Sequence, residues 1–201
     1  YRLLSRDDGT LLFVDLVDRS LLLLLVSAGR MPSVLDRYSL EGMVISSQPS
    51  HMWSDREIAE RHLTDRNGRT WAYAHQTVQR RGGLLVFGSD APVETVDPWK
   101  GIQAAVTRLE AEDQPPWIGG ERITVRDALA AHTSRPARLH AHGFRTGLLE
   151  PGALADLVVL NRDPFTLKRS DLSTLWGGMK VDQTWLDGEL VFERQTDETS
   201  G

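Results

Sequence analysis

Asp90 is the residue whose type and position point most directly to chemistry. It follows the apolar run at residues 84–87, after Gly88 and Ser89. In barrels of alternating strands and helices, functional groups gather at the carboxyl ends of the strands. A carboxylate at such a position can bind a metal ion or accept a proton. The same pattern is also typical of an aspartate that only caps the turn leading to Pro92.

His51 and Glu94 are the next candidates. His51 follows a second apolar segment, residues 43–47, and histidine serves both as a metal ligand and as an acid or base near neutral pH. A single histidine in a loop is, however, more often solvated. Glu94 comes four residues after Asp90, so it is a candidate for a carboxylate pair with Asp90 or for an exposed loop residue.

The other histidines show no clear metal-binding pattern. His140 and His142 are two residues apart, but at the expected end of a helix they fall on different faces, and we interpret them as surface or capping residues. The chain has no His-Glu-x-x-His, Gly-x-Ser-x-Gly, Gly-x-x-x-x-Gly-Lys-Ser/Thr or Gly-x-Gly-x-x-Gly motif. Nothing therefore indicates a zincin helix, a nucleophile elbow, a phosphate loop or a dinucleotide fold.

The composition excludes several classes of protein. The chain has 201 residues, 40% of them hydrophobic and 25% charged, which is typical of a globular domain. It contains no cysteine, which excludes disulfides, thiolate zinc sites and a cysteine nucleophile. A net charge of −5 gives no general attraction to nucleic acid or to anionic lipid. Since the apolar run at residues 21–26 is far shorter than the roughly 20 residues of a bilayer span, we expect no membrane segment and a cytoplasmic protein.

Residues 34–146 alternate strand-like and helix-like segments, which predicts an α/β architecture with parallel strands. The two candidate strands are short apolar runs, and the helices between and after them carry apolar residues at spacings of three and four. The expected strands are residues 43–47 and 84–87; the expected helices are residues 55–63, 68–81, 98–110, a segment capped by Thr124, and 135–141.

The remaining parts of the chain do not alternate strand-like and helix-like segments. Residues 147–194 are mainly β, with an expected strand at 155–160 and a hairpin around Asp187-Gly188, the dipeptide most typical of a tight hairpin turn. Residues 1–33 contain two strand-like runs that are candidates for pairing beside residues 43–47. We therefore divide the chain into an unmatched segment (1–33), an α/β part (34–146), a β subdomain (147–194) and a tail (195–201).

Residues 34–194 resemble the carboxyl-terminal part of the metal-dependent amidohydrolase superfamily, in particular the amidohydrolase 3 type that includes N-substituted formamide deformylases. The resemblance depends on several short segments in a fixed order. They are Ser46-Ser47-Gln48-Pro49-Ser50-His51, Trp71-Ala72-Tyr73, Phe87-Gly88-Ser89-Asp90-Ala91-Pro92-Val93-Glu94, residues 98–108, Thr124-Val125-Arg126-Asp127-Ala128-Leu129 with Thr133 and Ala137, Gly147-Leu148-Leu149-Glu150-Pro151-Gly152, and Ala155-Asp156-Leu157-Val158-Val159-Leu160.

The resemblance implies a (β/α)₈ TIM barrel beside a small β-sandwich, of which this chain would hold the last two strand–helix units and part of the sandwich. It also implies one or two divalent metal ions, usually zinc, that activate water for hydrolysis of a non-peptide carbon–nitrogen bond in a small amide-like substrate. Asp90 matches the family's aspartate after the last barrel strand, which ligates metal and transfers a proton. His51 and Glu94 would then contact substrate.

The chain also departs from the family pattern. The family's other metal ligands, histidines and a bridging residue from earlier strands, have no counterpart here, and residues 1–33 contain no histidine. The chain also begins with Tyr1. We therefore expect either a partial gene product or a chain whose first residues are read in a wrong or diverged frame, in both cases inactive by itself and without a bound metal. The alternatives are a non-catalytic remnant or binding module and, less in keeping with the motifs, a complete small α/β protein of another class.

Overall fold

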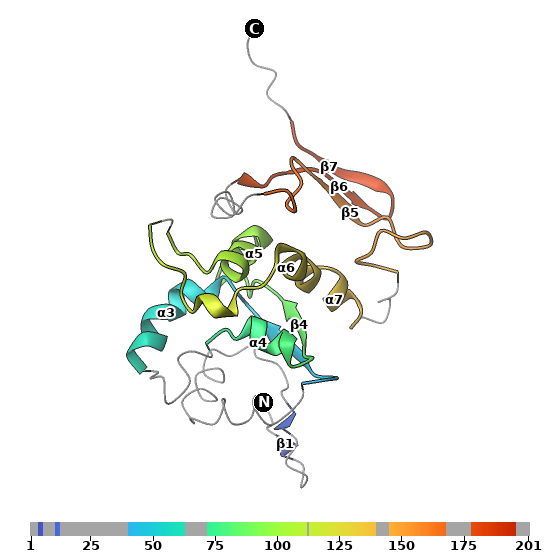
Figure 1. The fold of residues 1–201 in the computed structure, drawn as a ribbon. Helices are drawn as coiled ribbons and strands as arrows, with labels where there is room; N and C mark the ends of the chain where they lie inside the picture. Colours follow the sequence, from blue (N-terminus) through green and yellow to red (C-terminus); the bar gives the residue numbers. More distant parts are fainter. Residues whose placement is uncertain are drawn as a thin grey trace.

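A computed structural model of the chain describes residues 4–5, 11–12, 40–62, 72–111, 113–139, 145–167 and 178–195. Figure 1 shows that the helices of the middle of the chain surround a pair of short strands, and that a separate sheet lies beyond them towards the carboxyl end. The chain is thus a mixed α/β protein, as the alternation of segments predicted. The run at residues 21–26 lies outside the described residues.

The central pair of strands is parallel. Strand β3 (Val44–Ser47) lies beside β4 (Leu84–Phe87), with Val44 opposite Leu84 and Ser47 opposite Phe87. The two strands correspond to the apolar runs in the sequence, and their direction is the one expected for strands joined through helices. Because they are parallel and in register, their carboxyl ends lie side by side. This arrangement brings the residues that follow Ser47 and Phe87 to the same edge of the structure.

In the described residues between β3 and β4 there are two helices, and both differ from the expected bounds. Helix α3 (His51–His62) begins four residues earlier than predicted, because the turn at Gln48-Pro49 leads directly into it, with His51 N donating to Gln48 O at 3.1 Å. Helix α4 (His75–Arg80) is shorter than the predicted 68–81. Tyr73 has φ 54°, a left-handed conformation that no helix contains. Gly82, with φ 82°, follows the helix, as the Gly-Gly pair predicted.

Helix α5 (Pro98–Thr107) follows β4 after a ten-residue loop. Asp97 caps it by accepting a hydrogen bond from Trp99 N at 2.9 Å, and Pro98 occupies the first turn, as expected. The helix ends three residues earlier than predicted, because Arg108 adopts φ 57°.

The last helices of this part are short. A 3₁₀ turn, η3 (Gly119–Glu121), leads to α6 (Val125–His132) and α7 (Ser134–Ala137). The predicted cap of α6 is confirmed: Thr124 Oγ1 accepts a hydrogen bond from Asp127 N at 3.0 Å and donates to Asp127 Oδ2 at 2.6 Å. Helices α4, α6 and α7 all contact β4, so they form the layer that covers it.

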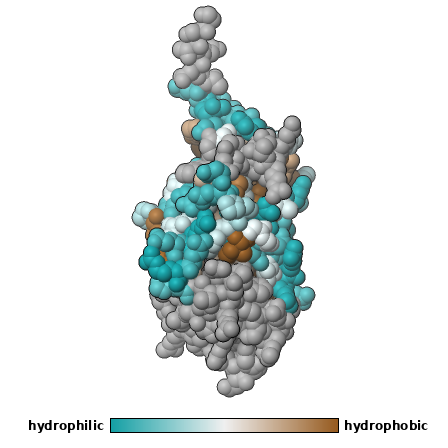
Figure 2. Space-filling model, turned by 60° about the vertical axis from the view of Figure 1, so that its left-hand side comes forward, coloured by the Kyte–Doolittle hydropathy of each residue, from teal (hydrophilic) through white to brown (hydrophobic). Residues whose placement is uncertain are grey.

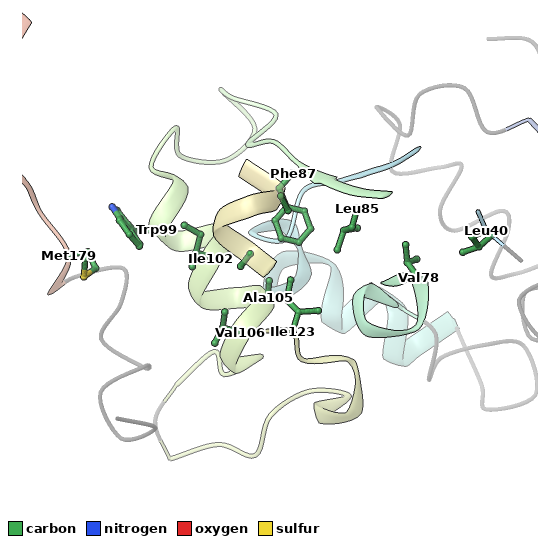
Figure 3. Close-up of a cluster of buried hydrophobic side chains, with 12 residues drawn as sticks. Leu40, Val78, Leu85, Phe87, Trp99, Ile102, Ala105, Val106, Ile123 and Met179 are labelled. Carbon is green, nitrogen blue, oxygen red and sulfur yellow. The ribbon is translucent and has the colours of Figure 1, made fainter. Parts of the chain in front are cut away.

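A hydrophobic core fills the space between β4 and these helices. Figure 3 shows Leu85 and Phe87 of β4 together with Ile102 and Ala105 of α5 in this core. The side chains of Leu85 and Ile102 are 0% and 1% exposed. Trp99 and Met179 lie at one end of the cluster and Leu40 at the opposite end. The core therefore joins the central strands to Leu40, which precedes β3, and to Met179, which precedes β6.

The carboxyl-terminal sheet is antiparallel, with strand order β5 (Leu157–Leu160), β6 (Val181–Leu186) and β7 (Glu189–Glu193). The predicted hairpin is confirmed: Asp187 and Gly188 have φ 50° and 81°, as a type I′ turn requires. Many of the sheet's apolar side chains are exposed, and Figure 2 shows small hydrophobic areas among hydrophilic ones in the upper part of the molecule, where the sheet lies.

The first described residues form a small element of their own. Strand β1 (Leu4–Ser5) pairs antiparallel with β2 (Leu11–Leu12). In the described residues, β3 pairs with β4 and not with these strands, so the expected pairing of residues 1–33 beside 43–47 is not seen there. None of the described helices combines the length and apolar character that crossing a bilayer requires.

Candidate functional site

Asp90 lies just beyond the carboxyl end of the strand pair. Gly88 N donates to Ser47 O at 3.2 Å, which extends the pairing of the strands by one residue before the chain turns away. Asp90 itself has φ 55°, and its carbonyl oxygen accepts a hydrogen bond from Val93 N at 2.9 Å. This tight turn leaves the Asp90 side chain 31% exposed. Its carboxylate is thus reachable from solvent and held on a backbone of defined shape.

His51 lies next to Asp90, although the two are 39 positions apart in the sequence. Its Nε2 donates a hydrogen bond to Ser89 O at 3.3 Å and lies 4.0 Å from Asp90 Oδ2. The interpretation of His51 as a loop residue is wrong, because it is the first residue of α3 and its side chain is only 5% exposed. The parallel strands bring these two candidates together, while the role of each stays a prediction.

Glu94 faces Lys100 of α5. The Glu94 carboxylate forms an ion pair with Lys100 Nζ, and the two side chains are only 15% and 17% exposed. Lys100 Nζ also lies 5.9 Å from the ring centre of Trp53, in the first turn of α3. Glu94 is therefore not an exposed loop residue. The sequence analysis missed Lys100; a signal for it is the single lysine in the first turn of the helix that follows this acidic loop.

Two further histidines flank Phe87 at the same end of the strands. The ring of Phe87 lies 5.0 Å from that of His75 and 5.4 Å from that of His132. His75 Nε2 is 3.0 Å from Ser47 Oγ. Burial, aided by the charge of Arg108, lowers the pKa of His75, and burial lowers the pKa of His132 to about 4. Both rings are therefore neutral at pH 7 and act here as packing groups.

Arg108, the residue directly after α5, is a buried cation that binds backbone carbonyls. Its guanidinium donates to the carbonyl oxygens of Trp117, Tyr73 and Ala72 at 2.5, 3.0 and 3.1 Å. Burial lowers the pKa of Arg108 to about 10, while Glu121 acts to raise it, so the group stays charged at pH 7. These bonds fix the left-handed turn that precedes His75.

The described residues do not form a complete metal centre. Among the residues whose placement is described, no group of three or more His, Cys, Asp or Glu side chains is arranged to hold a metal ion. A catalytic zinc ion commonly takes three protein ligands. Asp90 can supply one oxygen ligand, and His51 Nε2 is occupied as a donor to Ser89 O. The described residues alone thus do not fit a bound metal ion.

The chain is an α/β protein in which a carboxylate, Asp90, lies just beyond the carboxyl end of a parallel strand pair. The chain belongs to the amidohydrolase family, whose model matches residues 26–192.

Three relatives illustrate the range of the family. The Arabidopsis thaliana protein LONG AFTER FAR-RED 3 is 33% identical over 155 residues, which are 75% of this chain and 27% of that protein. YtcJ of Bacillus subtilis strain 168, which carries the name of an amidohydrolase, is 32% identical over 85% of this chain and 30% of its own length. An N-substituted formamide deformylase of Arthrobacter pascens is 35% identical over 56% of this chain and 20% of its own. The chain thus spans less than a third of the length of these relatives.

A solved structure is also similar to this chain. A metal-dependent hydrolase of Pyrococcus horikoshii, otherwise uncharacterised, matches 61% of this chain and 25% of its own with a TM-score of 0.53 at 31% identity.

Proposed function

We propose that this chain is the carboxyl-terminal catalytic portion of a metal-dependent hydrolase that cleaves non-peptide carbon–nitrogen bonds in small amide or formamide substrates. The observation that carries the proposal is the position of Asp90, a partly exposed carboxylate at the carboxyl end of a parallel strand pair, in a chain of the amidohydrolase family. The names of two relatives, an amidohydrolase and a formamide deformylase, support this class of substrate.

In this proposal Asp90 has two tasks. As an oxygen ligand it would contribute to a divalent metal site, with zinc as the metal, whose other ligands would come from polypeptide outside the described residues. As a base it would take the proton of the attacking water and then return that proton to the leaving amine. Its partial exposure leaves the carboxylate open to a metal ion and to a substrate that approaches from solvent.

We propose that His51 and Glu94 border the substrate. His51 Nε2 lies 4.0 Å from Asp90 Oδ2, so a substrate bound at Asp90 would lie close to the His51 ring. Glu94 lies on the same loop. The architecture that we propose for this part is the last two strand–helix units of a (β/α)₈ barrel, residues 34–146, with residues 147–194 as part of a β-sandwich.

Metal content and hydrolysis test the proposal. The 201-residue chain, expressed by itself, is expected to bind no stoichiometric zinc and to release no amine from an N-formylated amine, because its described residues offer an incomplete ligand set. In a longer protein that contains this chain and hydrolyses such a substrate, Asp90→Asn is expected to abolish turnover. Near-normal turnover by Asp90→Asn would overturn the role given to Asp90.

A non-catalytic binding module is the second candidate, and the incomplete set of metal ligands among the described residues favours it. The two candidates differ in one measurement. A longer protein that contains this chain and neither binds zinc nor hydrolyses an N-formylated amine supports the binding module. Stoichiometric zinc together with hydrolysis excludes it.

A further inference from the structure

The loop that carries Asp90 is held by side chains at three points. It runs from Gly88 to Asp97, between β4 and α5. His51 donates to the Ser89 carbonyl near its start, and Asp97 caps α5 at its end. Between these points the loop has few backbone hydrogen bonds, and the one from Val93 N to Asp90 O closes the turn at Asp90. The third point is Glu94, whose carboxylate pairs with Lys100.

The Glu94–Lys100 pair is far more enclosed than the Arg61–Glu57 pair on α3. Its side chains are 15% and 17% exposed, whereas the Arg61 and Glu57 side chains on α3 are 64% and 80% exposed. An exposed pair contributes little to stability, because solvent screens it and its flexible side chains must be ordered. A partly buried pair is screened less, and removing one partner leaves a desolvated charge without its counterpart.

Lys100 also links the loop to α3. Its ammonium lies 5.9 Å from the centre of the Trp53 ring, within the range of a cation–π contact. Trp53 is two residues from His51, in the same first turn of α3. One lysine thus contacts the loop through Glu94 and the helix that carries His51 through Trp53. The loop and α3, the two elements that meet at Asp90, are thus both in contact with Lys100.

We propose that Glu94 and Lys100 are positioning residues: their ion pair fixes the turn at Asp90 and thereby the direction of its carboxylate. That this positioning matters for catalysis rests on the role proposed for Asp90. That the ion pair fixes the turn does not depend on that role. Only three residues lie between Asp90 and Glu94, and Val93, which donates to Asp90 O, is the residue directly before Glu94, so a displacement of Glu94 would disturb this hydrogen bond.

Solvent exchange of the Val93 amide, measured by ¹⁵N NMR on the full 201-residue chain, tests the proposal without substrate or metal. The Val86 amide in β4 is an internal control, since it reports on the strand and not on the loop. Glu94→Gln, which keeps the shape and removes the charge, is expected to speed Val93 exchange about five- to tenfold, to shift the Asp90 amide resonance, and to leave Val86 unchanged. Glu57→Gln, which breaks the exposed pair on α3, is the matched variant and is expected to change neither amide.

Exchanging the charges completes the test. The double variant Glu94→Lys with Lys100→Glu is expected to return Val93 exchange to within about twofold of the original rate, because it restores an opposite-charge pair at the same place. Val93 exchange within about twofold of the original in Glu94→Gln, or equal acceleration of Val86, would overturn the proposal. The proposed role of Asp90 would survive that outcome, and loss of the Asp90 role would leave the NMR result intact.

Discussion

The strand pair β3–β4 with its helices and the sheet β5–β6–β7 differ in how far they bury their own apolar residues. In the first region Leu85 and Ile102 are 0% and 1% exposed, whereas Leu186 and Phe192 of the sheet are 59% and 48% exposed. Burial of apolar surface stabilises a fold in proportion to its area. The helix-covered strands therefore supply most of the stability of the described chain, and the sheet is held mainly by its hydrogen-bonded ladder.

Arg108 gives the strongest test of this contrast. Arg108→Met is expected to lower the free energy of unfolding by about 3–5 kcal/mol, because three carbonyl oxygens lose their donor and Glu121 loses a nearby positive charge. In the sheet, Arg194→Met breaks a pair with Asp182 whose side chains are 40% and 36% exposed, and less than about 1 kcal/mol is expected. Urea unfolding measures both; equal losses would contradict the contrast.

Leu85 tests the hydrophobic core itself. Leu85→Ala is expected to remove about 3 kcal/mol, since the cavity it leaves is enclosed by β4 and the helices. Leu186→Ala in the sheet removes a side chain that solvent already reaches, and a change within about 0.5 kcal/mol is expected. A large loss at Leu186 would mean that the sheet has a buried face in solution.

The loss of stability that comes from histidine protonation should arise in the helix-covered region, because residues 157–193 contain no histidine. The pKa of His132 is lowered from 6.5 to about 4, so the unfolded chain binds more protons than the folded one below pH 6.5. Stability is therefore retained above pH 6.5 and falls as the pH drops towards 4, by about 2 kcal/mol from His132 between pH 7.5 and pH 5. The lowered pKa of His75 adds to this loss.

Urea unfolding at pH 7.5 and pH 5 measures the effect of acid. His132→Gln should reduce the loss of stability between the two pH values by the roughly 2 kcal/mol attributed to His132. Leu186→Ala, in the sheet that contains no histidine, is the matched variant and should lose as much stability between the two pH values as the original chain. A loss that is the same in His132→Gln would exclude His132 as its source.

Substitutions at Gly188 and Gly82 are expected to give the smallest difference in stability between the two regions. Both have positive φ, 81° and 82°, so an alanine at either is strained by about 1 kcal/mol. At Gly188 the nearest atom to an added Cβ is 3.9 Å away, whereas at Gly82 it is Glu41 Cγ at 2.8 Å. Gly188→Ala should therefore cost about 1 kcal/mol and Gly82→Ala somewhat more, as thermal unfolding of both variants can show. A larger loss at Gly188 would contradict this order.

The elements that local patterns specify could be predicted from the sequence. Strands β3 and β4, the Thr124 cap and the Asp187-Gly188 turn each depend on residues close together in the chain, and all are present. The lengths of α3 and α4 could not be predicted, since they depend on the turn at Gln48-Pro49 and on the left-handed Tyr73, which long-range bonds to Arg108 support.

The site was predicted in part for the same reason. Asp90 and His51 could be named because each follows an apolar strand, but their contact required the parallel register of β3 and β4. The pairing of Glu94 with Lys100 depends on how α5 leaves the loop, which no spacing rule gives. His75 and His132 were assigned no role, because only the packing around Phe87 shows that both are buried there.

The register of the strands also bears on the order of folding. The β6–β7 hairpin joins Leu186 to Glu189, so it can close within microseconds from neighbouring residues. The pairing of Val44 with Leu84 must instead bring together segments separated by the whole of α3 and α4, and such non-local contacts form slowly. We therefore expect a full-length chain that refolds from denaturant to form its carboxyl-terminal hairpin before His51 and Asp90 meet.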